Sequence, residues 1–177
     1  RSYPVAVAHF PARRDESLEH QVRRAVEHAL VEHPGDVLVF LPGQREIAKV
    51  QALLSPSPSG RGVGVRVAIP VKSSPSTNPH PPFGHLLPEG EGNSEVEILV
   101  LHGELPIEQQ TRVLQPAENG CRRVVLATNV AESSVTLPGV RVVIDAGLAR
   151  EPKFDPNSGF SRLEVVAISQ ASADQRA

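Results

Sequence analysis

The chain has 177 residues and a formal net charge of −2, with 18 basic and 20 acidic side chains well mixed along it. The length predicts one domain with a sizeable core, and the charge balance excludes a global basic field that would hold nucleic acid by itself. The single Cys121 excludes an intramolecular disulfide, and the lack of a secretory segment or long apolar span predicts a cytoplasmic protein without membrane contact. Because there is no Met even at position 1, we expect a piece of a longer reading frame.

The first part of the chain predicts a helix and a strand followed directly by a second helix. Residues 3–10 predict a short strand or an extended lead-in, and apolar residues at helical spacing predict a helix over 17–33. The dense apolar run 36–41 is too short for a helix and predicts a buried parallel strand. Helical spacing resumes after the Gly43-Gln44 turn, so the free backbone N–H groups of that turn are candidates for binding an anion.

The composition changes abruptly over residues 55–94, where Pro, Ser and Gly dominate. Such a segment cannot bury enough apolar area to offset its ordering entropy, so it predicts an inserted, mostly disordered surface loop. A short apolar run at 63–71 is a candidate strand within it. His80 and His85 have no acidic or Cys companions, so we interpret them as solvated loop residues and predict no metal site.

A buried strand is predicted next over 97–101, followed by a helix over 107–114 whose first turn suits the preceding Pro106. His102 at the strand end is either a base or a packing and backbone hydrogen-bonding residue. The second interpretation is favoured because no nucleophile is adjacent in the sequence. Strands that alternate with helices at these intervals predict right-handed βαβ units and a mostly parallel sheet, which is an α/β fold.

A polar loop at residues 128–136 is the first candidate site. It lies between two β-branched runs, 124–127 and 140–145, which predict two buried strands. In open α/β sheets, ligands bind in the crevice beyond the carboxyl ends of the parallel strands. The loop begins at such an end, so its Thr, Asn, Glu and Ser side chains are the candidates for chemistry.

The last part of the chain predicts a basic β-hairpin. Residues 148–154 and 160–168 surround a dense cluster of turn formers, and Arg150, Lys153 and Arg162 give the two strands a basic character. Residues 169–177 are polar and end without a stop signal, so we expect the chain to be cut there.

Four segments in this order resemble the second RecA-like domain of DEAH-box ATP-dependent helicases. They are L-V-F-L-P-G-Q-R-E-I, L-H-G-E-L-P, V-L-A-T-N-V-A-E-S-S-V-T and I-S-Q-A-S-A-D-Q-R-A. The run L-A-R-E-P-K-F-D-P-N-S-G-F-S-R-L-E is most similar to the bacterial HrpB branch. The resemblance covers residues 3–54 and 95–177. It implies a RecA-like fold of three layers, a parallel sheet flanked by helices, in one incomplete domain over 1–177 that carries the insert.

The resemblance implies a set of contacts to the backbone of single-stranded nucleic acid. Hydroxyls, amides and free N–H groups suit this task because they position phosphate without reading the sequence of bases. The implied residues are Gly43, Gln44, Thr128, Asn129, Arg150 and Lys153.

The resemblance also implies contacts to ATP. Gln175 begins the family's last motif and would reach the γ-phosphate, so it is the catalytic candidate, while Ser134 and Thr136 would link the nucleotide to the strand-binding loop. The alternative for these two hydroxyls and for Ser133 is that they cap a short helical turn. In the family, the phosphate-binding Lys and the acid pair that holds Mg²⁺ belong to the preceding RecA-like domain, so the chain alone is expected to be inactive.

Two positions depart from the family pattern. Pro138 stands where many relatives carry an acidic residue near the ribose, so a side-chain acceptor is missing. Leu114 stands where many eukaryotic relatives present an aromatic ring to the adenine, so apolar packing is retained and ring stacking is lost.

The leading hypothesis is therefore a part of an ATP-dependent helicase that acts on RNA in preference to DNA, with the hairpin as a wedge or grip. Its partners would be single-stranded nucleic acid and the preceding RecA-like domain of the same polypeptide. The rival hypothesis is a non-enzymatic module that only docks nucleic acid or protein. A third is that the insert marks a decayed gene. Flanking coding sequence with a phosphate-binding Lys and a D-E-x-H acid pair would favour the helicase.

Overall fold

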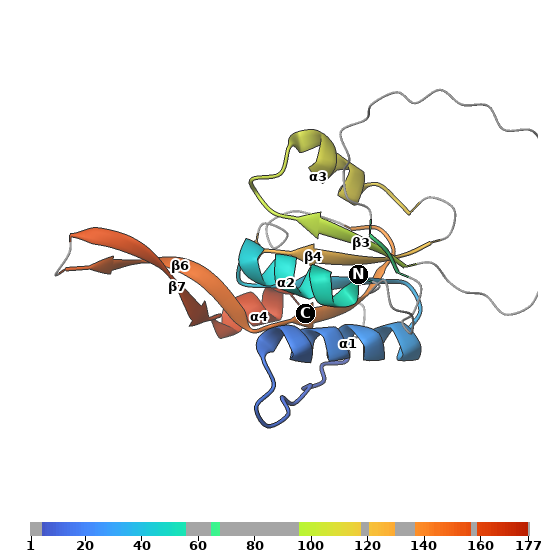
Figure 1. Ribbon diagram of the computed structural model, residues 1–177, viewed down its shortest axis with the longest axis horizontal. Coiled ribbons are helices and arrows are strands. Elements are labelled where there is room, and N and C mark those ends of the chain that lie inside the picture. The colour runs from blue at the N-terminus through green and yellow to red at the C-terminus, as the bar shows by residue number, and fades with distance from the viewer. Residues whose placement is uncertain are drawn as a thin grey trace, which may run out of the picture.

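A central sheet of five parallel strands organises the structure, a computed structural model that describes residues 5–55, 65–67, 96–117, 121–129, 137–156 and 159–176 (Figure 1). The strand order is β2-β3-β4-β1-β5, and all neighbouring pairs are parallel. The strands are β1 (Asp36–Phe40), β2 (Val65–Val67), β3 (Val96–Leu101), β4 (Arg122–Ala127) and β5 (Val140–Asp145). The predicted parallel α/β sheet is confirmed, and its strands present their carboxyl ends at one edge.

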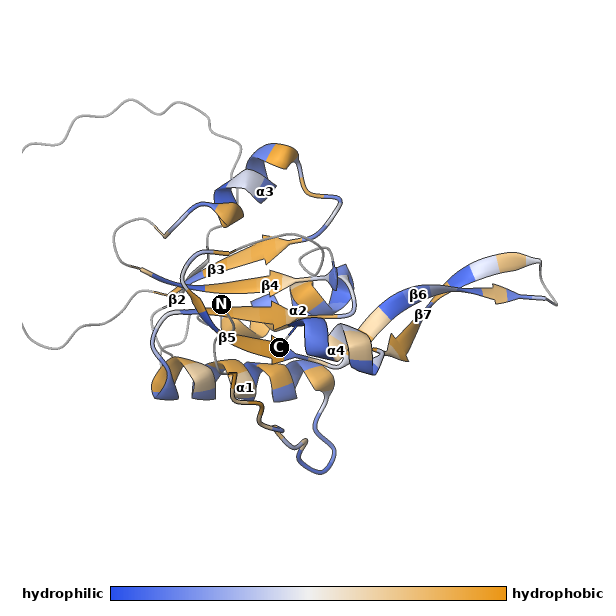
Figure 2. Cartoon of the chain, turned by 180° about the vertical axis from the view of Figure 1, so that it is seen from behind, coloured by the Kyte–Doolittle hydropathy of each residue, from blue (hydrophilic) through white to orange (hydrophobic). Residues whose placement is uncertain are grey.

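Helices cover both faces of this sheet and complete three layers (Figure 1). Helices α1 (Leu18–Glu32) and α2 (Gln44–Leu54) bury Val26 and Val50 against one face. Helix α3 (Ile107–Leu114) buries Val113 against the other face. Because the middle strands are covered on both sides, they read as continuous apolar runs, and Figure 2 shows the hydrophobic residues concentrated in the strands.

A local cap begins helix α1, and a distant side chain holds its end. The Ser17 hydroxyl accepts a hydrogen bond from the N–H of His20, which caps the start of α1. At the other end, the guanidinium of Arg122 donates to the backbone oxygens of Leu30, His33 and Gly35. These bonds satisfy carbonyl groups that the end of a helix leaves without partners, and they tie α1 to the amino end of β4.

Strand β5 is less buried than the sequence predicts. Its residues alternate between half-buried and exposed, and Val143 is 40% exposed, whereas the residues of β4 from Arg123 onward are buried. The reason is the strand order, because β4 lies between β3 and β1 while β5 is at the end of the described sheet. The prediction of two buried strands is therefore correct for β4 and wrong for β5.

The predicted hairpin is confirmed as β6 (Leu148–Asp155) and β7 (Phe160–Ala167), an antiparallel pair that projects from the body of the domain (Figure 1). Its two faces differ in chemistry because side chains alternate along a strand. One face carries Phe154, Leu163 and Val165, which are all exposed. The other face carries Lys153 and Glu151 across from Arg162 and Glu164, with the exposed Phe160 at its far end. The hairpin is thus an amphipathic arm.

The two ends of the chain differ from expectation. Residues 5–10 contain no regular strand, so the extended lead-in is the correct alternative for that described part. Residues 170–176 form helix α4 (Gln170–Arg176), which the sequence interpretation missed. A signal was present, since the Ser169 hydroxyl accepts a hydrogen bond from the N–H of Ser172 as a helix cap does.

Of the insert at 55–94, the structure describes Ser55 and the segment Val65–Val67. The latter is strand β2, so the candidate strand at 63–71 is confirmed over that length. It pairs with β3 and extends the sheet. The prediction of disorder for the remainder of the insert lies outside the described residues.

Candidate nucleic-acid interface

The carboxyl ends of β1, β3, β4 and β5 hold the candidate site loops side by side. Backbone hydrogen bonds continue past the strands: Leu41 donates to Ala127 at 2.8 Å, Thr128 donates to Leu101 at 3.1 Å and Ala146 donates to Phe40 at 3.2 Å. The loops that leave these strands therefore start from fixed positions on one edge of the sheet. That edge is where an open parallel sheet binds its ligands.

The Gly43-Gln44 turn joins β1 to α2 as predicted. Gly43 is the N-cap residue, and no side chain caps the helix there, so N–H groups of its first turn are available to an anion. The backbone of Gly43 is extended, a conformation open to any residue. A Cβ atom at this position would lie 2.7 Å from Nε of Arg150 and 3.0 Å from a carboxylate oxygen of Glu46, so a larger residue would displace these side chains.

A side-chain contact joins the turn after β1 to the end of β3. The amide nitrogen Nε2 of Gln44 lies 3.3 Å from Nδ1 of His102, and the backbone oxygen of His102 accepts a hydrogen bond from Leu105. Both contacts agree with the interpretation of His102 as a hydrogen-bonding residue at the strand end. They also place Gln44 beside the loop that follows β3.

Arg150 belongs to this edge of the domain. Its Nη2 lies 3.1 Å from Glu46 in the first turn of α2, and its side chain is 30% exposed. Its Nε atom is buried without a hydrogen-bond partner among the described residues. The same Nε atom lies 2.7 Å from the position that a Cβ atom would take at Gly43, so the Arg150 side chain covers the start of α2.

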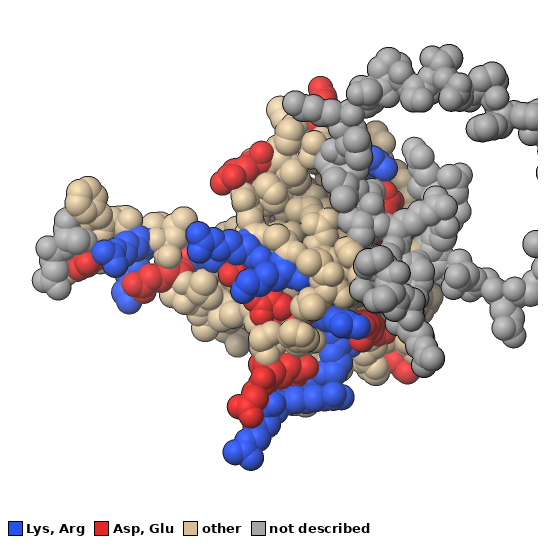
Figure 3. Space-filling model, in the orientation of Figure 1, with Lys and Arg blue, Asp and Glu red and all other residues tan. Residues whose placement is uncertain are grey.

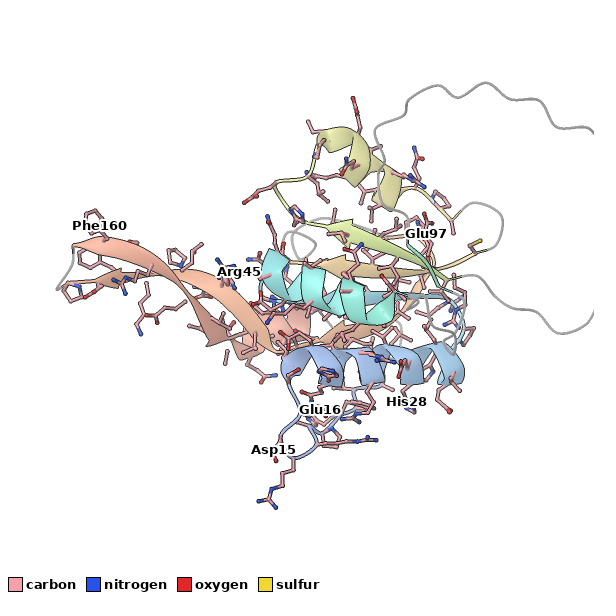
Figure 4. All side chains as sticks on the ribbon, viewed as in Figure 1. Asp15, Glu16, His28, Arg45, Glu97 and Phe160 are labelled. Carbon is pink, nitrogen blue, oxygen red and sulfur yellow. The ribbon has the colours of Figure 1, made fainter. Side chains whose placement is uncertain are left out.

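Lys153, by contrast, lies away from this edge. It is farther along the hairpin, on the opposite face from Arg150, where its Nζ pairs with Glu164 at 3.1 Å. Arg162 lies directly across from it on β7. Basic side chains line the hairpin and continue to its base with acidic ones among them (Figure 3). In Figure 4, Arg45 lies at that base, beside the start of α2, and Phe160 lies at the far end. The structure thus separates Lys153 from the other predicted contacts.

The polar loop after β4 is described only at its ends. Thr128 is half-buried and Asn129 is exposed, and both follow the last paired residue of β4, Ala127, which lies across from Phe40 at the end of β1. Ser133, Ser134 and Thr136 lie outside the described residues. Their predicted contacts to the nucleotide, and the alternative capping role, remain predictions.

Gln175 is exposed on α4, while the next residue, Arg176, is buried. Arg176 pairs with Asp145, so α4 is held at the carboxyl end of β5, on the same edge as the other candidate residues. Sequence reasoning missed Asp145 and Arg176 as parts of this edge. Only the position of Arg176 next to Gln175 in the last motif offered a signal.

Pro138 and Leu114, the two departures from the family pattern, both lie within the described residues. The backbone oxygen of Pro138 accepts a hydrogen bond from Arg123 at 2.8 Å, so this residue contributes its carbonyl group to the fold. Leu114 ends α3 with its side chain partly exposed.

Within the described ranges, no helix is long and apolar enough to cross a membrane. Those same residues contain no group of His, Cys, Asp or Glu that could hold a metal ion.

A three-layer parallel α/β domain with polar loops at the strand carboxyl ends is an architecture that RecA-like domains share, and comparisons with known proteins identify the chain as one of them. The family described as helicase conserved C-terminal domain matches residues 83–176, and the chain belongs to that family. It is 33% identical, over its whole length, to the ATP-dependent RNA helicase HrpB of Escherichia coli (strain K12), of which it covers 18%.

Two further comparisons place the chain among helicases of the DEAH type. It is 34% identical to the pre-mRNA-splicing factor ATP-dependent RNA helicase prp22 of Schizosaccharomyces pombe, over 99% of this chain and 13% of that protein. The crystal structure of the E. coli DExH-box NTPase HrpB superposes with a TM-score of 0.72 at 32% identity, over 99% of this chain and 18% of that one. The chain thus spans less than a fifth of these relatives.

Proposed function

We propose that this chain is the second RecA-like domain of an ATP-dependent helicase, in which it binds the backbone of single-stranded nucleic acid and closes the ATP cleft. RNA is the favoured substrate, because the similar proteins HrpB and prp22 are named as RNA helicases. The domain spans 1–177 and carries the insert at 55–94. A bacterial, cytoplasmic setting is part of the proposal, and the similarity to HrpB of Escherichia coli supports its bacterial part.

The observation that carries the proposal is the meeting of three elements at one sheet edge. Gly43 begins α2 with N–H groups free to bind, the Nε atom of Arg150 lies over Gly43, and Thr128 follows the adjacent strand β4. Backbone N–H, guanidinium and hydroxyl groups are the donors that hold phosphate oxygens without reading bases. Asn129 adds an exposed amide to the same set.

ATP would bind on the side of the edge where α4 lies. The exposed amide of Gln175 is a suitable donor to a phosphate oxygen, and the buried neighbour Arg176 keeps the helix in place. Cleavage of ATP supplies the free energy for moving the strand. Ser134 and Thr136 are the further candidates in this chain, while the preceding RecA-like domain would supply the groups that hold Mg²⁺. Hydrolysis is accordingly proposed for the full-length protein and not for this chain alone.

The test is nucleic-acid-stimulated ATP hydrolysis by the full-length protein, with Thr128→Ala as the variant. Loss of the hydroxyl is expected to weaken the stimulation about fivefold, the cost of about one hydrogen bond to phosphate. Thr111→Ala is the matched control, since the Thr111 hydroxyl bonds to the Ile107 carbonyl within its own helix α3. Unchanged stimulation in Thr128→Ala would remove the role assigned to this residue.

Binding at several salt concentrations, with RNA and DNA strands of matched length, tests the preferred substrate. Contacts to the phosphate backbone release counterions. The affinities for RNA and for DNA are therefore both expected to fall as the salt concentration rises. Tighter binding of RNA at every salt concentration is the expected result. Equal affinity would contradict the RNA preference and leave the strand-binding role intact.

A docking module remains the second candidate because of the exposed apolar face of the hairpin. Phe154 and Leu163 are both more than 60% exposed on that face. Exposed apolar area of this kind suits a protein partner. A full-length protein that binds nucleic acid or protein without hydrolysing ATP would favour this candidate over the helicase.

A further inference from the structure

One carboxylate oxygen joins the base of the hairpin to the helix that carries Gln175. Oδ1 of Asp145, at the carboxyl end of β5, accepts a hydrogen bond from the N–H of Gly147 at 2.8 Å. The same oxygen accepts a hydrogen bond from Nη1 of Arg176 in α4 at 3.0 Å. The base of the hairpin and helix α4 therefore share a single hydrogen-bond acceptor.

Arg176 faces the interior of the domain and not the candidate ATP site. Its side chain is 3% exposed, and its guanidinium carbon lies 4.7 Å from the centroid of the Phe40 ring at the end of β1. A buried guanidinium needs a charged partner, and here Asp145 provides it while the aromatic ring covers its face. Gln175, the preceding residue, is exposed as a consequence of the helical rotation between successive residues.

Gly147 closes the base of the hairpin. Its φ of +70° is a conformation that suits glycine, and it turns the chain from β5 into β6. Its N–H donates to Asp145, and its backbone oxygen accepts a hydrogen bond from Ile168, which follows β7. Both strands of the hairpin thus meet the rest of the domain at the residue that Asp145 holds.

We propose that Asp145 and Arg176 are positioning residues that couple the orientation of the hairpin to the orientation of helix α4. Neither residue is among the contacts proposed above for nucleic acid or ATP. A movement of the hairpin on a bound strand displaces Gly147, and Asp145 transmits the displacement to Arg176 and hence to Gln175. This inference rests on the proposed function and assigns to it the route from the strand to the nucleotide.

The test is Asp145→Asn in the full-length protein. The amide oxygen can still accept the bond from Gly147, but the charge that holds Arg176 is lost. The nucleic-acid-stimulated kcat of ATP hydrolysis is expected to fall about tenfold or more, because a misplaced catalytic group costs rate steeply. The KM for ATP and the affinity for the strand are expected to change by less than about twofold, since no ligand contact is removed. A merely structural defect would instead weaken the affinities for ATP and for the strand together with the rate.

Asp174→Asn is the matched control, because it makes the same chemical change on the exposed side of α4 and leaves Asp145 and Arg176 intact. It is expected to keep the stimulated kcat within about twofold of the wild type. An equal fall of the stimulated kcat in Asp174→Asn would overturn the inference. The loss of a negative charge near α4 would then explain both variants without any coupling. Should Asp145→Asn fail to fold, Arg176→Lys carries the same test with the positive charge kept.

The outcomes separate the inference from the proposed function. A wild-type protein without strand-stimulated hydrolysis would refute the proposed function. If the wild type shows stimulation and Asp145→Asn retains it in full, the coupling is overturned and the proposed function stands. A double variant, Asp145→Asn with Arg176→Lys, is expected to lose no more stimulation than the stronger single variant, because both changes break one connection.

Discussion

Nη2 of Arg123 lies 2.7 Å from Oδ2 of Asp36, and the two side chains are only 2% and 7% exposed. The backbone N–H of Arg123 also donates to Oδ1 of the same carboxylate, so β1 and β4 are joined by charge at their amino ends. The guanidinium further donates to the backbone oxygens of Gln115 and Pro138. One buried pair therefore holds the end of α3 and the end of the polar loop against the sheet.

Breaking this buried pair is expected to destabilise the protein strongly. Arg123→Met leaves the carboxylate of Asp36 buried without its partner, which costs about 3–5 kcal/mol. The measurement is the free energy of unfolding from denaturant titration. The control is Lys153→Met, which removes the exposed pair with Glu164 and is expected to cost no more than about 1 kcal/mol. Equal losses in the two variants would show that the Arg123 pair adds nothing beyond a surface contact.

Two glycines with positive φ offer a matched comparison of strain and crowding. Gly139 has φ +90°, and a Cβ atom there would lie 3.0 Å from Oδ2 of Asp36, whereas nothing lies within 4 Å of a Cβ at Gly147, where φ is +70°. Gly147→Ala is expected to cost about 1–2 kcal/mol from the backbone conformation alone. Gly139→Ala should lower the free energy of unfolding further, because it also presses on the buried carboxylate. A smaller effect at Gly139 than at Gly147 would contradict the crowding.

A methyl group at Gly43 is expected to weaken binding of nucleic acid more than it affects stability. It would meet the flexible side chain of Arg150 and displace it from the turn, a movement that costs little folding free energy. The expected result for Gly43→Ala is an affinity for single strands several-fold lower, about 1 kcal/mol, measured by titration at fixed salt. In an Arg150→Ala background the same change should have little further effect, since the displaced group is already gone. Independent, additive losses would argue against the shared site.

The lowered pKa values of two carboxylates, Glu16 and Glu19, predict how the stability of the protein depends on pH. The side chain of Arg24 donates a hydrogen bond to Glu16 and lowers the pKa of Glu16 from 4.5 to about 2. Lys49 likewise lowers the pKa of Glu19 from 4.5 to about 2 and ties α1 to α2. The unfolded chain has the ordinary, higher pKa, so this stabilisation is complete above pH 4.5 and is lost as the pH falls towards 2.

The variant Glu16→Gln/Glu19→Gln should therefore lose less stability than the wild type between pH 5 and pH 2, a window of about three units set by these two pKa values. Denaturant titrations at a series of pH values measure the slope. Glu108→Gln, an exposed carboxylate on α3, serves as the control and should keep the slope of the wild type. A double variant with an unaltered slope would contradict the lowered pKa values.

Much of the candidate site was predictable from local patterns, and its assembly was not. The turn at Gly43-Gln44 and the polar residue Thr128 follow from where apolar runs end, and both lie at the sheet edge in the structure. Their roles toward nucleic acid stay predictions, as does that of Gln175. Arg150 and Lys153 could not be separated from the sequence, because which of two basic residues on one strand meets α2 depends on how the hairpin joins the body.

The sequence by itself determined most of the helices and strands, with α4 as the exception, because hydrophobic periodicity and breaking residues act over a few neighbours; helix α3 has the predicted bounds, 107–114. It also determined the family, through four motifs in order. Only the tertiary structure decided that β5 is half exposed, that Arg176 is buried against Asp145, and that Arg150 lies over Gly43. These features depend on strand order and on contacts between residues far apart in the chain, which side-chain packing selects and no local pattern records.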